Sequence, residues 1–184
     1  MKTRTVVPAA IIAALFLAAS GFMAAEQMQF RGRMFTGNMA FPVANVKIIC
    51  DSLSKPDDLA EIIIARNTGG PEAMNERMAK FNVGNIQFIG GRGLRIDLHM
   101  AFEKKTEKGL QLFLVGRSQK ADPNASRTFL DNTYVLVLQL DLDEKFNGEA
   151  KIMEDAVVRF SAAGDFKVES YRTTPKMLVN IQKQ

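Results

Sequence analysis

The sequence predicts an α+β fold in which two N-terminal helices pack on a curved, mostly antiparallel meander sheet of seven or eight strands. Three observations predict it. Apolar residues recur every three or four positions from about residue 54 to 81. After residue 82 the apolar period falls to two and stays there to about residue 181. Turn signals separate consecutive runs, as in successive hairpins. Such a sheet either stays open, with the helices covering one face, or curls towards a closed barrel, and we expect an α+β arrangement with a strongly curved sheet, the barrel-like form remaining an alternative.

The helical region follows a short strand at 45–50 that is rich in β-branched residues. Ser54 is the expected N-cap of the first helix, and Pro56 stands in the first turn, where its missing N–H does no harm. Two aspartates follow Pro56, and their negative charges interact favourably with the positive N-terminal end of the helix dipole. Gly69 and Gly70 are expected to end this helix, and a second one is expected to run to about Phe81.

The later strands are expected from alternating apolar and polar residues. In the first, Leu94, Ile96, Leu98, Met100 and Phe102 fall on one face. Asn147-Gly148 is a strong hairpin signal because both residues tolerate positive φ. The expected strands lie at 94–102, 110–115, 133–142, 149–153, 156–160, 166–171 and 177–181.

The first 25 residues have the pattern of a signal peptide. Met1–Arg4 is basic, and Val6–Ala25 is an uncharged, largely apolar run that ends in small residues. Cleavage would leave a chain starting near Phe22 or Glu26. The run is also long enough to span a bilayer, so an uncleaved anchor of a structural protein is the alternative. We therefore expect an exported protein, periplasmic or extracellular, with one α+β domain at 26–184 and no membrane span once the signal is removed.

Composition limits the partners. Loss of Lys2 and Arg4 with the signal lowers the 24 basic residues to 22, against 20 acidic ones. This near balance, with the basic residues scattered, predicts no nucleic-acid partner. The single Cys50 ends an apolar run and allows no internal disulfide. It is expected to be a buried thiol, the alternative being a thiol that pairs with a partner.

The sequence points to no catalytic residue, metal or cofactor. Its single His and single Cys exclude the common zinc sites, which need three or four N or S ligands. A hydrolase that uses strand carboxylates, with or without His99, is the alternative function. The carboxylates on strands or at strand ends are Asp97, Glu103, Asp141, Glu149 and Glu169.

The preferred function is a non-enzymatic binding module for an apolar ligand or an envelope partner. Both faces of the middle strands carry apolar residues, for example Phe113 beside Leu112 and Val135 beside Leu136. The helices cover one face, so closure of the sheet, a ligand or a partner must cover the other. The candidate ligand-lining residues are Leu112, Leu114, Leu136 and Leu138.

Several segments resemble an uncharacterised family of exported proteins of soil bacteria. The resemblance covers roughly Val46 to Ile181 and implies export and this fold, with no established activity and no site residue. It departs at Val115–Ser118, where the family often has Thr-Asp-Arg-Pro. The matching pieces are Val46–Leu59, Leu110–Arg117, Tyr134–Asp143 with Gly148-Glu149, and Val168–Tyr171 with Pro175 and Leu178.

Overall fold

The computed structural model describes residues 27–35, 42–90, 93–121, 128–160 and 166–184. The expected signal segment, residues 1–25, lies outside them. The strands are β1 (Met28–Phe35), β2 (Ala44–Cys50), β3 (Gly84–Ile89), β4 (Arg95–Thr106), β5 (Gly109–Ala121), β6 (Thr128–Leu142), β7 (Asn147–Phe160), β8 (Phe166–Tyr171) and β9 (Lys176–Lys183), and the helix is α1 (Pro56–Met78).

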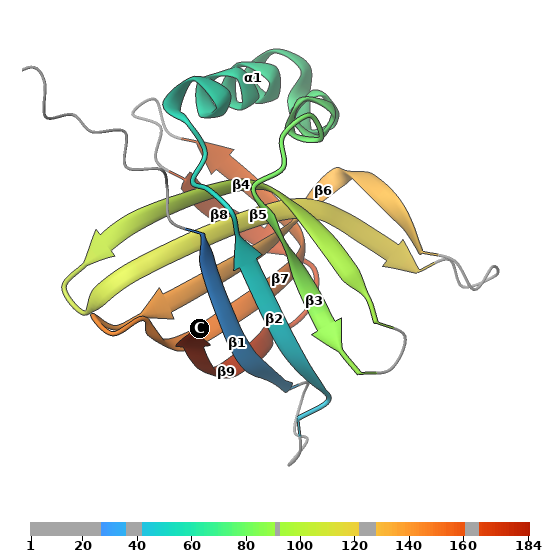
Figure 1. Cartoon of the computed structure of the whole chain (residues 1–184). Coiled ribbons are helices and arrows are strands. Elements are labelled where there is room, and N and C mark those ends of the chain that lie inside the picture. Colours follow the sequence, from blue (N-terminus) through green and yellow to red (C-terminus); the bar gives the residue numbers. More distant parts are fainter. Residues whose placement is uncertain (1–26, 36–41, 91–92, 122–127, 161–165) are drawn as a thin grey trace, which may run out of the picture.

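Eight of these strands close into an antiparallel barrel in the order β1-β2-β3-β4-β5-β6-β7-β9 (Figure 1). Consecutive strands pair from β1 to β7, and two further pairings close the ring, because β9 pairs with β1 on one edge and with β7 on the other. β8 lies outside the ring and pairs with the C-terminal half of β7. Closure gives each strand of the ring a partner on both sides, which an open sheet cannot do.

The prediction of two N-terminal helices packed on an open, curved sheet is therefore wrong. The helical region is one element, kinked at Gly70, whose φ of 76° and ψ of −163° are not helical. It lies across the outside of the barrel (Figure 1). The local pattern located the helical residues, most of the antiparallel strands and the β6–β7 hairpin. It contained no signal for the β1–β9 and β7–β9 pairings, which join segments that are not consecutive in the chain.

The start of α1 also differs from the expected cap. Lys55 is the N-cap and its side chain makes no capping hydrogen bond, whereas Pro56 and the following acidic turn stand as expected. Ser54 has another role: its hydroxyl oxygen accepts a hydrogen bond from the backbone N–H of Ala101, at 3.0 Å. The backbone N–H of Ser54 in turn donates to the carbonyl of Ala101, at 2.7 Å. This pair of bonds ties the entry of α1 to β4.

The apolar side chains form two separate cores. The interior core fills the barrel with side chains from the strands of the ring, among them Phe30, Ile48, Leu98 and Leu138, each 0% exposed. The outer core lies between α1 and the outer wall of β4–β7, and includes Ile62 and Met78 of the helix with Val137 of the wall. The apolar residues on both faces of the middle strands are thus covered by closure on one side and by the helix on the other.

A bulge in β4 changes which face its side chains occupy. Leu98 pairs with Gly116 and Met100 with Val115, so His99 is an extra residue in β4. Ile96 and Leu98 consequently belong to the interior core, whereas Met100 and Phe102 face the outer core. The prediction that all five alternating residues of this strand share one face is wrong for that reason.

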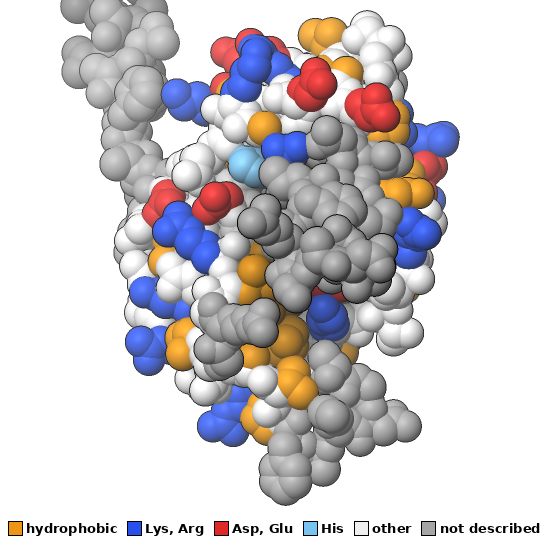
Figure 2. Space-filling view, turned by 90° about the vertical axis from the view of Figure 1, so that its right-hand side faces the viewer, with side chains coloured by type: hydrophobic (Ala, Val, Ile, Leu, Met, Phe, Trp, Pro, Cys, Tyr) orange, Lys and Arg blue, Asp and Glu red, His pale blue; other side chains and the backbone are white. Residues whose placement is uncertain are grey.

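Charged side chains are mixed in sign on the face of the molecule shown in Figure 2, where Lys and Arg lie among Asp and Glu. Within the described residues, no helix combines the length and the apolar character needed to cross a lipid bilayer.

Cys50 is 0% exposed in the interior core, and its Sγ donates to the carbonyl of Ser52 at 3.5 Å. Burial raises the pKa of this thiol from 9.0 to about 11. The neutral thiol is thus favoured in the folded state, so its contribution to stability is complete below pH 9 and is lost as the pH rises from 9 to 11.

Between pH 8 and pH 11, we expect the free energy of unfolding of the wild type to fall by about 2 kcal/mol more than that of the Cys50→Ala variant. Urea denaturation of both proteins across this range measures the difference. A thiol reagent at pH 8 should also label the folded protein far more slowly than the unfolded one. Equal pH profiles of the two proteins would contradict the buried thiol.

Candidate functional site

The four candidate ligand-lining leucines lie together inside the barrel. Leu112, Leu114 and Leu138 are 0% exposed and Leu136 is 2% exposed. Leu114 pairs directly with Leu138 across β5 and β6. All four pack against side chains of the interior core. They fill the interior of the barrel, as side chains do in small closed barrels.

A different apolar cavity lies outside the barrel, between α1 and the outer wall. We call it the phenylalanine pocket, and its volume is about 270 Å³. One turn of α1 forms one side, with Leu59 and Ile63. Glu103 and Lys104 of β4 are exposed and stand at its rim. Its wall consists of four aromatic side chains: Phe102, Phe113, Phe160 and Phe166.

The four rings form one cluster centred on Phe166. The ring centroid of Phe166 lies 4.7 Å from that of Phe102 and 5.7 Å from that of Phe160, both in edge-to-face geometry. It lies 5.3 Å from that of Phe113, which also stacks on Phe102 at 5.3 Å. These are the preferred separations and orientations of aromatic pairs, so the cluster is a pre-formed apolar wall.

Sequence reasoning missed this pocket for two physical reasons. The bulge at His99 moves Phe102 to the face opposite Leu98, next to Phe113 on the neighbouring strand. Phe160 of β7 and Phe166 of β8 lie directly opposite each other, and β8 is the strand outside the ring. A signal was nevertheless present, because Phe160 ends one expected strand and Phe166 begins the next, and such positions face each other when the two strands form a hairpin.

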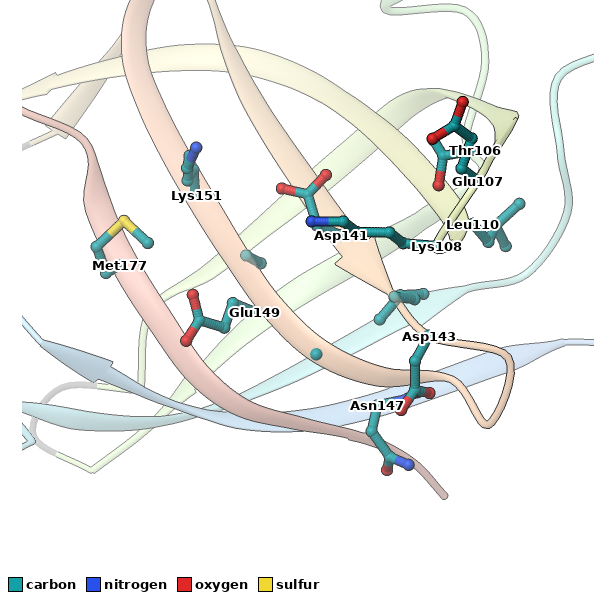
Figure 3. A pocket seen from close by; sticks show the side chains of 13 residues that line it. Thr106, Glu107, Lys108, Leu110, Asp141, Asp143, Asn147, Glu149, Lys151 and Met177 are labelled. Atoms are coloured by element: carbon teal, nitrogen blue, oxygen red, sulfur yellow. Dashed lines mark hydrogen bonds between the residues drawn. The ribbon is translucent and has the colours of Figure 1, made fainter.

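A larger groove of about 900 Å³ lies on the outer wall where the β4–β5 and β6–β7 hairpins meet β9 (Figure 3). Asp141 and Glu149 are directly opposite each other in β6 and β7, and Lys151 and Met177 lie on the same side. Asp141 accepts hydrogen bonds from the amides of Gln111, at 2.6 Å, and Gln139, at 3.1 Å. Both carboxylates are exposed, whereas catalytic groups usually work where water is excluded.

The Asp143 carboxylate, which lines the same groove, supports the backbone of the hairpin. Its Oδ1 accepts hydrogen bonds from the backbone N–H groups of Lys145 and Asn147, each at 2.8 Å. Among the described residues, the structure shows no group of three or more His, Cys, Asp or Glu side chains placed to hold a metal ion.

The other residues of the hydrolase hypothesis are dispersed. The Asp97 carboxylate is exposed and pairs with Arg95, at 3.1 Å. His99 Nδ1 lies 2.7 Å from the carbonyl oxygen of Phe81, so the ring joins the β4 bulge to the segment that follows α1. Glu169 pairs with Arg159, at 2.8 Å. Only Asp141 and Glu149 come together, and His99 is engaged in holding the fold.

In comparisons with known proteins, no family model, no curated protein and no solved structure matches this chain. The family resemblance drawn from the sequence therefore stays a prediction.

Proposed function

We propose that the chain is an exported, non-enzymatic protein that binds a small apolar molecule in the phenylalanine pocket. The observation that carries the proposal is the pocket itself, an apolar space with four pre-packed aromatic rings on one side and a helix on the other. The expected export signal supports a periplasmic or extracellular place of action.

The size of the pocket indicates the class of ligand. An apolar cavity of about 150 Å³ is enough to bind benzene, so 270 Å³ suits a molecule of roughly ten non-hydrogen atoms. Such a ligand is a medium-length alkyl chain or a one- or two-ring hydrocarbon. The interior leucines form a less suitable binding site, because a ligand there would have to displace side chains that already fill the barrel.

The rim adds a preference for one polar end. Glu103 and Lys104 are exposed beside Phe102, so a polar group at the mouth keeps its contact with water. A ligand with an apolar body and a small polar head therefore fits better than a pure hydrocarbon.

Two neighbouring isoleucines of α1 provide a matched test with 1-decanol as the probe. Ile63 lines the pocket, whereas Ile64 is 61% exposed and is not part of the lining. Ile63→Lys places an ammonium group against the aromatic wall and should weaken decanol binding at least tenfold. Ile64→Lys should bind as the wild type does. Calorimetric titration of the three proteins measures the effect, and circular dichroism checks that each is folded.

The proposed binding site would be refuted if the wild type did not bind decanol, or if the two substitutions weakened decanol binding equally. Native mass spectrometry of protein from its own source gives an independent check. A bound small mass that is lost on denaturation supports a carrier. If the protein carries no bound molecule and takes up no decanol, binding to an envelope partner becomes the better hypothesis for the function of an exported, non-enzymatic protein.

A further inference from the structure

A polar groove of about 650 Å³ lies on the outer wall of the barrel, where β9 and β2 flank β1. Its polar lining consists of two guanidinium groups and four carboxamides: Arg31, Arg33, Asn45, Asn180, Gln182 and Gln184. The lining includes no carboxylate side chain. We call this the arginine groove.

The cations of this region are concentrated on one face. Arg31 and Arg33 are both exposed and stand two residues apart in β1, with the buried Gly32 between them, so both side chains leave the same face. Lys47 of β2 lies directly opposite Arg31. Like charges directly opposite on adjacent strands destabilise a sheet. Across the described ranges, none of these three side chains forms an ion pair with an acidic side chain.

A bulge in β9 brings a further polar side chain to the groove. Arg31 pairs with Gln182 but Arg33 pairs with Val179, so β9 has an extra residue opposite Gly32. Asn180 lies in this bulge with a φ of 55°, a conformation uncommon for residues other than glycine. Bulges re-aim side chains and are frequent beside binding sites. Here the bulge places the Asn180 carboxamide in the lining that contains the two arginines.

We propose that the arginine groove binds a phosphate group. Guanidinium groups present paired N–H donors that match the oxygens of a phosphate, and carboxamide N–H groups supply further donors. A phosphate monoester has close to two negative charges at neutral pH, so it neutralises more of the repulsion among Arg31, Arg33 and Lys47 than a single carboxylate does. The two arginines of the groove are exposed to solvent, so a soluble phosphate compound and a lipid headgroup can both reach them. This proposal is independent of the apolar ligand, because the two sites share no residue.

Pyrophosphate is the first probe, titrated into the full-length mature protein at low ionic strength. We expect saturable binding that weakens at least tenfold in the double variant Arg31→Gln/Arg33→Gln. Both residues are exposed, so the variant should fold. The control protein combines Lys105→Gln with Arg159→Gln, since both residues are exposed and lie outside the groove, and the two substitutions together also remove two positive charges. Backbone amide shifts of Asn180 and Gln182 should move in the wild type on titration.

Vesicles separate the two sources of the phosphate group. Co-sedimentation with phosphatidate-containing vesicles that is stronger than with phosphatidylcholine alone, and is lost in the double variant, assigns a lipid headgroup. Binding of pyrophosphate without vesicle binding assigns a soluble phosphate compound. The proposal is overturned if neither probe binds, or if the control and the double variant bind equally. Decanol binding should be the same in the double variant and the wild type, so failure here leaves the phenylalanine pocket untouched.

Discussion

Leu138→Ala is expected to lower the free energy of unfolding by about 3–5 kcal/mol. Leu138 is 0% exposed, pairs with Leu114 on one side and Ile152 on the other, and lies in the interior core. The barrel wall is tied by backbone hydrogen bonds on both edges of each strand, so it can collapse little around the cavity that the substitution leaves. The loss should therefore fall in the upper part of the range seen for buried leucines. Urea denaturation followed by circular dichroism measures it.

Ile64→Ala is the control for this prediction. Ile64 is 61% exposed on α1, so its truncation should change stability by less than about 0.5 kcal/mol. A Leu138→Ala protein as stable as the wild type would mean that the interior is loosely filled. In that case a ligand inside the barrel would again be a reasonable hypothesis.

Gly84→Ala is expected to destabilise the protein by about 2–5 kcal/mol, through two effects that act together. Gly84 has a φ of 146°, which residues with a side chain rarely adopt. A Cβ atom there would also overlap the carbonyl oxygen of Ile49 on β2, which is backbone and cannot rotate away. Thermal and urea unfolding of the variant measure the combined cost.

Gly90→Ala separates the two effects. Gly90 has a φ of 116°, and a Cβ atom there meets no atom of the described residues within 4 Å. This variant should cost only about 1–2 kcal/mol, the conformational part. If both variants lost the same stability, the close approach of β2 and β3 at Gly84 would not be the cause.

The fold was predicted from sequence as far as local patterns determine it. The alternation in Val135–Leu142 gave the correct two faces of β6, with Leu136 and Leu138 inside and Val135 and Val137 outside, because the pairing with β5 is regular there. The alternation at 94–102 failed, because one extra residue at His99 reverses the faces beyond it. A bulge changes no residue type, so hydropathy alone did not reveal it.

The candidate site was harder to predict for a related reason. Apolar residues on both sides of a strand predict that both sides are covered, and this is true of Phe113 and Leu112. What covers each side depends on the closure of the ring and on where α1 crosses it. The predicted ligand-lining residues are on the leucine face, for which closure of the sheet, a ligand and a partner were all possible covers, and in the structure closure covers it. In the folded chain the unfilled apolar space is on the other face, beside Phe113.

The position of β9 between β1 and β7 has a consequence for biogenesis. Strands emerging from a ribosome or a translocation channel can add to their predecessor one by one as far as β7, but β1 must wait for the final strand of the described chain. Until then two hydrogen-bonding edges are open, that of β1 and that of the N-terminal half of β7, because β8 covers only the C-terminal half of β7. Each open edge can recruit the same edge of another copy. Quality-control factors that shield such edges would therefore matter most in the last step of maturation, and a chain shortened before β9 would be prone to associate rather than simply being less stable.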